Sequence, residues 1–162
     1  MSFRYRVERR DSSMRKHSNL RRRPLTKAQL LPLPAEQVRR LSLKHHLALA
    51  ALCEGRGDVD AIVTLSNVLA LAVCLSADGD VEPYRRADTA LAQSIARAER
   101  SEPWTLTDPE RTALEALALI HDEQLSAVPV HRYLDALEQV QRTDVRDVGL
   151  PIQPVRDRLS AD

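Results

Sequence analysis

The amino-acid sequence predicts an all-α fold: a compact bundle of about five helices between a basic N-terminal arm and a short C-terminal tail. Apolar residues make up 43% of the 162 positions and recur at the spacings of three and four that are typical of amphipathic helices. Only four glycines and five aromatic residues occur, and no run alternates Val, Ile or Thr with polar residues as a strand does. The core is therefore expected to consist of Leu, Ala, Val and Ile on closely packed helices.

Charge is distributed unevenly along the chain, although the net charge is only +1. Residues 1–34 hold ten of the 24 Lys and Arg and two of the 23 Asp and Glu, a net charge of +8. The remaining 14 basic and 21 acidic residues give residues 35–162 a net charge of −7. This asymmetry and the helical pattern divide the chain into a basic flexible arm (1–33), a helical bundle domain (34–142) and a C-terminal tail (143–162).

The first two helices of the bundle are expected on either side of a turn at residues 55–58. The first has Pro34 in its first turn and runs to about Glu54, where Gly55 and Gly57 end it. Its apolar residues share one face: Val38, Leu41, His45, Leu49 and Leu52. The second is capped by Asp58 or Asp60, ends near Asp78 and Gly79, and contains residues 61–77, which carry no charge. Its acidic flanks and polar interruptions favour a buried central helix over a membrane span.

Three further helices follow. The third begins at Pro83, ends near Arg100 and carries one apolar stripe: Tyr84, Ala87, Leu91, Ile95 and Ala98. A capping box at Thr107 and Glu110, with Pro109 in the first turn, predicts the start of the fourth, which runs to about Ala127. The apolar face of the fourth helix consists of Leu114, Leu117, His121 and Leu125. Pro129 opens the fifth, whose packing residues are Val130, Tyr133, Leu134, Leu137 and Val140.

The N-terminal arm is the segment whose chemistry points to a partner. Residues 1–30 show no helical periodicity and are expected to be mobile until bound. The basic character of this segment is the same whether translation starts at Met1 or at Met14. Six cations are the candidate nucleic-acid-binding residues: Arg15, Lys16, Arg21, Arg22, Arg23 and Lys27. Such a cluster binds phosphates by releasing counterions, whereas the alternative is a solvated leader that neutralises an acidic surface. Leu30, Leu31 and Leu33 are expected to pack on the body or on a second chain.

Enzymatic chemistry finds little support in the sequence. Several histidines and aspartates are superficially similar in type to the metal-binding residues of HD-type phosphohydrolases, but their spacing is not diagnostic: His45, His46, His121, Asp122, and His131 with Asp135 near it. Because His45 and His121 lie on apolar faces, hydrogen-bonded core histidines are the favoured interpretation. No activated nucleophile or phosphate-binding glycine loop is present. We expect no catalytic residue, no metal and no cofactor.

A DNA-reading helix-turn-helix is also disfavoured. If Gly55 lay in the turn, the following helix would present Ile62, Val63 and Leu65, which are too apolar to read a groove.

Residues 25–58, LTKAQLLPLPAEQVRRLSLKHHLALAALCEGRGD, resemble a loose group of small helical proteins encoded on proteobacterial plasmids, integrative elements and prophages. The shared features are a proline-flanked apolar segment, a histidine-containing helix and a Gly-x-Gly turn. Some members of the group carry a Fis-type transcriptional-regulator label. The resemblance implies an accessory or regulatory role in the bacterial cytoplasm, and it transfers no defined site. True Fis factors end in a basic helix-turn-helix, which residues 143–162 lack.

The sequence thus leaves three hypotheses about function. The leading one is a non-enzymatic regulator that contacts nucleic acid or a nucleoprotein complex through its arm, with a homodimer as a further expectation. The second is a protein-binding inhibitor or adaptor that acts on a host defence or transcription complex, in which the acidic body mimics nucleic acid or the arm binds an acidic protein surface. The third and weakest is a metal phosphohydrolase. Without an apolar N-terminal signal, and with Cys53 and Cys74 placed too far apart for a disulfide, we expect a cytoplasmic protein and no membrane partner.

Overall fold

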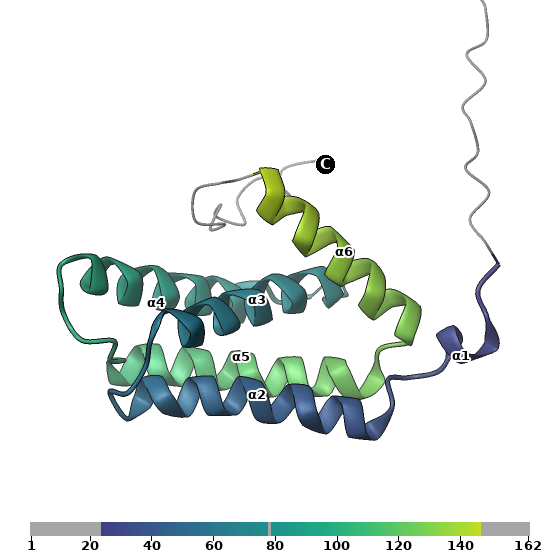
Figure 1. The fold of residues 1–162 in the computed structure, drawn as a ribbon, viewed down its shortest axis with the longest axis horizontal. Coiled ribbons are helices and arrows are strands. Elements are labelled where there is room, and N and C mark those ends of the chain that lie inside the picture. Colours follow the sequence, from purple (N-terminus) through teal and green to yellow (C-terminus); the bar gives the residue numbers. More distant parts are fainter. Residues whose placement is uncertain (1–23, 78, 147–162) are drawn as a thin grey trace, which may run out of the picture.

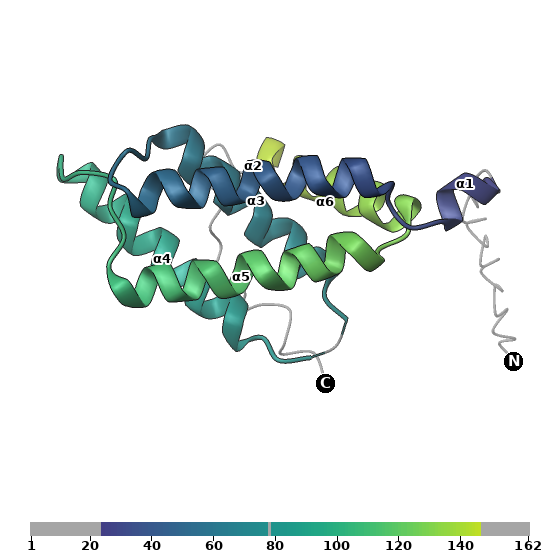
Figure 2. The ribbon, with the colours of Figure 1, turned by 90° about the horizontal axis from the view of Figure 1, so that it is seen from below.

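Six helices and no strand make up the part of the chain that the computed structural model describes, residues 24–77 and 79–146. In chain order they are α1 (Lys27–Leu30), α2 (Ala35–Cys53), α3 (Val59–Leu75), α4 (Glu82–Glu99), α5 (Asp108–Ala127) and α6 (Val130–Arg146). Helices α2 and α5 lie side by side in one layer, and α3 and α4 form a second layer above them (Figures 1 and 2). Helix α6 crosses α3 near the end of the bundle where α1 lies (Figure 1). The predicted all-α bundle is confirmed.

Helix α3 is the centre of this bundle. It packs against α2, α4, α5 and α6, as expected for a helix that is apolar nearly all round. Seven of its residues are buried: Ala61, Ile62, Leu65, Val68, Leu69, Leu71 and Ala72. Among the helices that the structure describes, none combines the length and apolarity that a membrane crossing requires. The uncharged segment is therefore a core helix, as the acidic flanks predicted.

Local signals fix the helix ends close to their predicted positions. Gly55 adopts a left-handed φ of 69°, and the N–H of Arg56 donates to the carbonyl of Ala51 at 2.8 Å, which closes α2. The side chain of Asp58 accepts from the N–H of Ala61 at 2.8 Å and caps α3. The capping box at Thr107 also forms. Pro34 differs slightly, because it is the N-cap of α2 and stands just outside the helix.

The predicted apolar faces form the core. Its larger cluster joins α2, α3, α4 and α5 through fully buried leucines, among them Leu52, Leu65, Leu91, Leu114 and Leu117. On α4, the stripe is most deeply buried at its first three positions, whereas Ile95 and Ala98 are only partly buried. A smaller cluster at the α1 end contains Leu33, Leu125, Val128 and Tyr133. The two clusters together account for the packing of every long helix.

The segment before α2 requires a correction. The sequence predicts no helical structure for residues 27–30, but they form the single turn α1, because Thr26 and Gln29 make a reciprocal capping box. The Thr-x-x-Gln spacing that encodes this turn is present in the sequence. Of the three leucines expected to pack on the body or on a second chain, only Leu33 is buried within this chain; Leu30 and Leu31 are each 54% exposed on it. One leucine therefore anchors this segment.

Helix α6 also differs from its prediction. It continues to Arg146, so the first four residues of the predicted tail are helical; residues 147–162 lie outside the described part of the chain. Leu134, predicted to pack, is exposed, while Tyr133 and Ala136 are buried. The apolar stripe of α6 is therefore narrower than predicted. Up to residue 142, its charged residues are exposed on the remaining face.

Candidate functional site

The basic arm enters the bundle through a short, well-bonded root, which we define as residues 24–33. The N–H of Leu33 donates to the carbonyl of Val128 at 3.2 Å, and the N–H of Val130 donates to the carbonyl of Leu31 at 2.9 Å. These two bonds pair the root with the connection between α5 and α6. The root is therefore held to the bundle by main-chain hydrogen bonds as well as by the buried Leu33.

His131 supplies a third bond to this root. Its Nδ1 lies 2.9 Å from the carbonyl oxygen of Gln29. A carbonyl can only accept, so Nδ1 carries the proton of the ring. The bond to Gln29 positions this histidine, and the nearby Asp135 is exposed on α6. His131 thus has a structural role that the sequence did not indicate, because its partner lies 102 positions away.

Most of the predicted nucleic-acid-binding residues precede the root. Arg15, Lys16, Arg21, Arg22 and Arg23 lie outside the described residues. Lys27 is exposed on α1, and Arg132 is exposed in the first turn of α6, the helix against which α1 packs. Neither forms an ion pair within residues 24–77 and 79–146. Two exposed cations that pair with no described acidic residue therefore lie at the root.

The two core histidines lie next to each other between α2 and α5. The ring centroids of His45 and His121 are 5.3 Å apart, with the planes tilted by 41°. His45 is 7% exposed and His121 is 1% exposed, so their predicted burial is correct. Burial, aided by the neighbouring His121, lowers the pKa of His45 from 6.5 to about 4, and burial also lowers the pKa of His121. Both rings are therefore neutral at pH 7.

Hydrogen bonding of this pair is incomplete. His121 Nδ1 lies 3.2 Å from Gln124 Oε1, while the amide nitrogen of Gln124 donates to the carbonyl of Ala72 and to the hydroxyl of Tyr84. Since Gln124 uses its amide group elsewhere, His121 must donate through Nδ1. Within the described residues, His121 Nε2 and His45 Nδ1 have no hydrogen-bond partner. The prediction of hydrogen-bonded core histidines thus holds for His121 and is wrong for His45, which makes no hydrogen bond in that part of the chain.

A second polar group lies along the seam between α2 and α5. The Ser42 hydroxyl donates to Asp122 Oδ1, and His46 Nε2 lies 2.7 Å from Asp122 Oδ2. Burial alone would raise the pKa of Asp122, but its hydrogen bonds with His46 and Ser42 outweigh burial and lower that pKa. Asp122 therefore ties the two helices together as a carboxylate.

These residues do not assemble into a metal centre. In residues 24–77 and 79–146, no group of three or more His, Cys, Asp and Glu side chains is placed to hold a metal ion. Asp122 is engaged by Ser42 and His46 rather than being directed at the histidine pair. The arrangement of the metal-phosphohydrolase hypothesis, which needed His45, His121, Asp122 and Asp135 together, is absent from this part of the chain.

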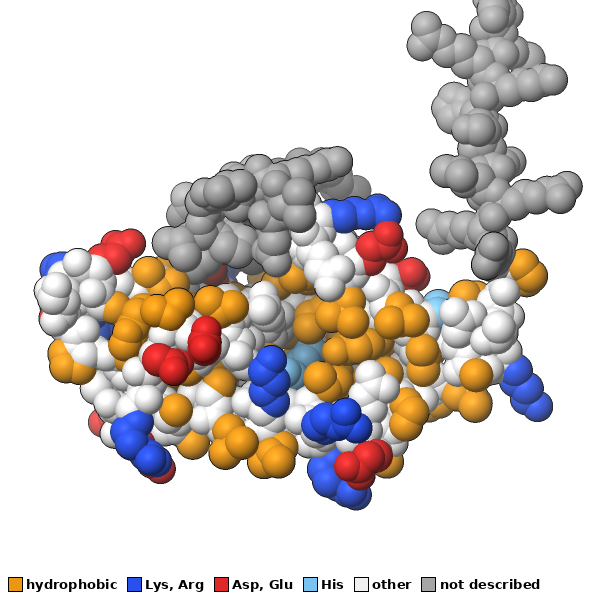
Figure 3. Space-filling model, in the orientation of Figure 1, with side chains coloured by type: hydrophobic (Ala, Val, Ile, Leu, Met, Phe, Trp, Pro, Cys, Tyr) orange, Lys and Arg blue, Asp and Glu red, His pale blue; other side chains and the backbone are white. Residues whose placement is uncertain are grey.

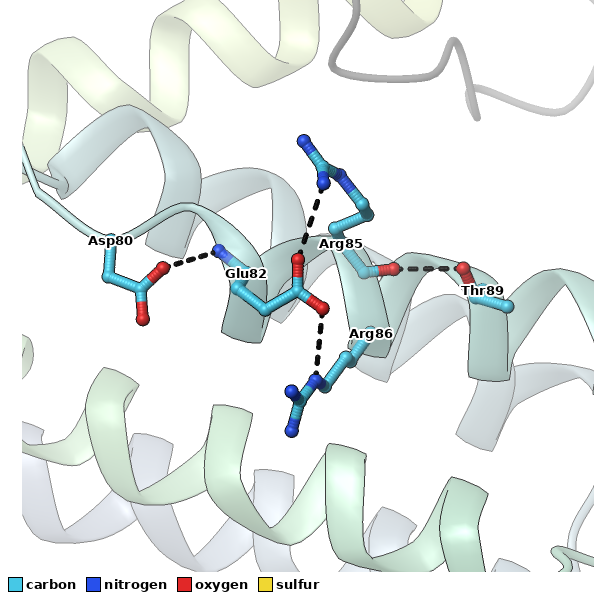
Figure 4. A network of polar contacts seen from close by, with 5 residues as sticks. All are labelled: Asp80, Glu82, Arg85, Arg86 and Thr89. Atoms are coloured by element: carbon cyan, nitrogen blue, oxygen red, sulfur yellow. Dashed lines mark hydrogen bonds and ion pairs between the residues drawn. The ribbon is translucent and has the colours of Figure 1, made fainter.

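An open groove of about 600 Å³ lies between α4 and α5. Glu82 is central to its polar lining, because one carboxylate oxygen binds Arg85 at 3.3 Å and the other binds Arg86 at 3.1 Å (Figure 4). The side chain of Asp80 accepts from the N–H of Glu82 at 2.9 Å, and the hydroxyl of Thr89 donates to the carbonyl of Arg85 (Figure 4). These contacts cap and brace the start of α4. The sequence interpretation did not single out this network, although its i, i+3 and i, i+4 spacings are visible in EPYRR.

A buried ion pair closes the other end of α4. Arg97 donates from both terminal nitrogens to the carboxylate of Glu110 at 2.6 Å, and the N–H of Thr107 donates to Glu110 Oε2 at 2.8 Å. Glu110 is only 4% exposed. Burial would raise the pKa of Glu110, but the bonds from Arg97 and Thr107 leave it below its usual value. The helix cap predicted from Thr107 and Glu110 therefore also joins α4 to α5.

The connection between α2 and α3 does not form a DNA-reading surface. Ile62 and Leu65 are buried, and only Val63 of the three residues considered is exposed. Within the described residues, the helix that follows this connection therefore has no free polar face with which to enter a DNA groove.

Comparison with family models, with curated proteins and with solved structures finds no match to this chain. The fold and the root define its class as an all-α bundle with a basic N-terminal segment attached beside α6.

Proposed function

We propose that the protein is a non-enzymatic mobile-element accessory or regulatory protein of the bacterial cytoplasm that contacts nucleic acid or a nucleoprotein complex through its Arg-rich arm. The observation that carries this proposal is the net charge of +8 on residues 1–34, set against −7 on the rest of the chain. A cationic segment of this density gains affinity for phosphates by displacing their counterions. Lys27 in the root and Arg132 beside it on α6 extend the cationic surface onto the bundle.

The bonded root supports different roles for the basic arm and the acidic bundle. It fixes where the arm leaves the bundle, so cations that precede it share a common origin on the surface. An acidic bundle repels a polyanion and keeps it from binding elsewhere on the protein. Contact is then concentrated on the arm, the root and the neighbouring Arg132.

A binding assay with matched variants tests this proposal. Fluorescence anisotropy would measure the affinity of the full-length protein for duplex DNA and for RNA at several salt concentrations. Replacing Arg21, Arg22 and Arg23 by Gln should weaken binding and reduce the slope of log K against log salt by about 0.9 for each duplex phosphate that is no longer neutralised. Replacing the same residues by Lys should retain most of the affinity, because the charge is kept.

The control removes the same charge from the bundle. Arg56, Arg85 and Arg100, each in an exposed ion pair, are replaced together by Gln. This variant should bind nucleic acid with nearly the affinity of the unaltered protein, because its arm is intact. Equal weakening by the two Gln variants, or no binding to either nucleic acid, would refute the proposal. A stoichiometric protein partner recovered from nuclease-treated lysate would then favour the inhibitor hypothesis.

A further inference from the structure

The outer face of the layer formed by α2 and α5 carries three exposed leucines. Leu43 and Leu47 on α2 are 58% and 61% exposed, and Leu119 on α5 is 62% exposed. Leu43 and Leu47 are one helical turn apart, and they lie opposite the buried residues His45, Leu49 and Leu52. Leu119 likewise lies opposite Leu117 and His121. We call this surface, with its flanking charges, the α2–α5 face; hydrophobic side chains gather along it over α2, at the lower edge of Figure 3.

The charges that flank these leucines are opposite on the two helices. Exposed Arg40 and Lys44 lie on α2, and exposed Glu123 lies on α5. None of the three forms an ion pair with another described residue. One half of the face is therefore basic and the other half is acidic, each with apolar residues beside its charges. Such a surface is complementary to a second copy of itself.

We infer that the α2–α5 face is the interface of a homodimer whose two-fold axis runs parallel to α2 and α5. A two-fold axis in this direction places α2 of one protomer over α5 of its partner, so the basic half meets the acidic half twice. An axis perpendicular to the helices would instead place α2 on α2 and bring like charges together. Charge therefore selects one of the two orientations.

The register along the helices follows from contacts within one chain. Leu33 pairs with Val128, and Gly55 lies beside Thr105, so α2 and α5 run in opposite directions. Ser42 and His46 both bond to Asp122, which puts Asp122 level with about the middle of residues 42–46. With equal rise per residue, position 47 is then level with about position 119, and position 43 with about position 123.

A two-fold axis parallel to the helices leaves the position of each residue along the helix direction unchanged. Leu47 of one protomer therefore faces Leu119 of its partner, and Lys44 comes within reach of Glu123. The same symmetry places both roots, and hence the origins of both arms, at one end of the dimer. The dimer itself does not depend on the proposed nucleic-acid function, because the face contains none of the arm residues.

Oligomeric state, measured without nucleic acid, tests the inference. Light scattering coupled to gel filtration should give twice the 18.2 kDa of one chain. Lys44→Glu alone and Glu123→Lys alone should each raise the dimer dissociation constant by about tenfold or more, since each change occurs twice in the dimer. An equal mixture of the two variants should regain the dimer, because every basic side chain then meets an acidic one.

Leu47→Gln should also dissociate the dimer, with Leu134→Gln as the matched control, because Leu134 is exposed on α6 and outside the face. Circular dichroism melting would show that each variant folds. A monomeric unaltered protein would overturn the inference. So would a dimer that tolerates Leu47→Gln, or one that Lys44→Glu leaves unchanged or strengthens, since that result indicates α2 packed on α2.

Discussion

At the scale of single residues, this protein keeps several polar groups in its interior and satisfies them unequally. Glu110 is buried but receives three hydrogen bonds from Arg97 and Thr107. His45 is buried with Nδ1 unpartnered among the described residues. The first arrangement stabilises a charged group, and the second keeps a ring neutral. These two sites should therefore respond differently to mutation and to pH.

Removing the partner of Glu110 should be costly. Arg97→Gln leaves a buried carboxylate without its cation, and we expect the free energy of unfolding to fall by about 3 kcal/mol. Arg85→Gln is the control, because its ion pair with Glu82 is exposed and contributes less than about 1 kcal/mol. Urea denaturation at pH 7 measures both. Equal effects of the two substitutions would contradict the buried ion pair.

The lowered pKa of His45 predicts a loss of stability in mild acid. The unfolded chain binds a proton at this histidine near pH 6.5, whereas the folded protein does so only near pH 4. The contribution of His45 is therefore complete above pH 6.5 and is lost as the pH falls toward 4, by up to about 3 kcal/mol. His45→Leu should flatten the decline between pH 6.5 and 4.5 in urea denaturation. Parallel pH profiles for the two proteins would show that His45 is not responsible.

At the scale of elements, caps and turns decide where helices begin and end. The attachment of the arm to the bundle depends instead on one buried side chain. The capping boxes at Thr26 and Thr107 start α1 and α5, and Gly55 closes α2. The root, however, is held by Leu33 and by main-chain bonds to the connection between α5 and α6. Its attachment is thus a tertiary contact rather than a local one.

Leu33→Ala should loosen the root. Truncating this buried leucine is expected to lower the free energy of unfolding by about 2–3 kcal/mol and to speed amide hydrogen exchange at Leu31 and Val130. The control is Leu31→Ala, which removes an exposed side chain and should change stability by less than about 0.5 kcal/mol. If both variants behave alike, the buried leucine does not hold the root.

At the scale of the whole molecule, the two layers create a surface with opposite charges on its two helices. No single helix has this property, because the basic half belongs to α2 and the acidic half to α5. In the inferred dimer, two arms depart from the same end. Two arms that bind one nucleic acid at two places would give the dimer a higher effective affinity than a single arm has.

The polarity of the dimer can be measured by cross-linking. Chains carrying Leu47→Cys and Leu119→Cys, both with Cys53→Ser, would be mixed and treated with a short bismaleimide. Positions 47 and 119 face each other across the interface, so the mixture should give a cross-linked dimer. The Leu47→Cys chain alone should give little, as should Cys53→Ser alone, which measures any reaction at Cys74. Strong cross-linking between two copies of position 47 would contradict the inferred axis.

The sequence by itself determined the helical class, the five long helices and most of their ends, because spacing, caps and glycines act within a few residues of one another. It also determined the burial of His45 and His121, since both occupy the apolar stripes of their helices. Only the tertiary structure decided that His131 bonds to Gln29, that the partly buried Arg97 binds the buried Glu110, and that Asp122 joins two helices. These contacts pair residues on different elements, and no periodicity within one helix encodes its partner.

For the basic arm too, the sequence determined one property and the tertiary structure another. Its charge could be counted from the residues alone. The structure decided where the arm attaches to the bundle. Thr26 and Gln29 form a local helical turn, and Leu33 is buried against Val128 and Tyr133. A buried leucine and an exposed one look alike in sequence when prolines interrupt the helical pattern, and only packing distinguishes them.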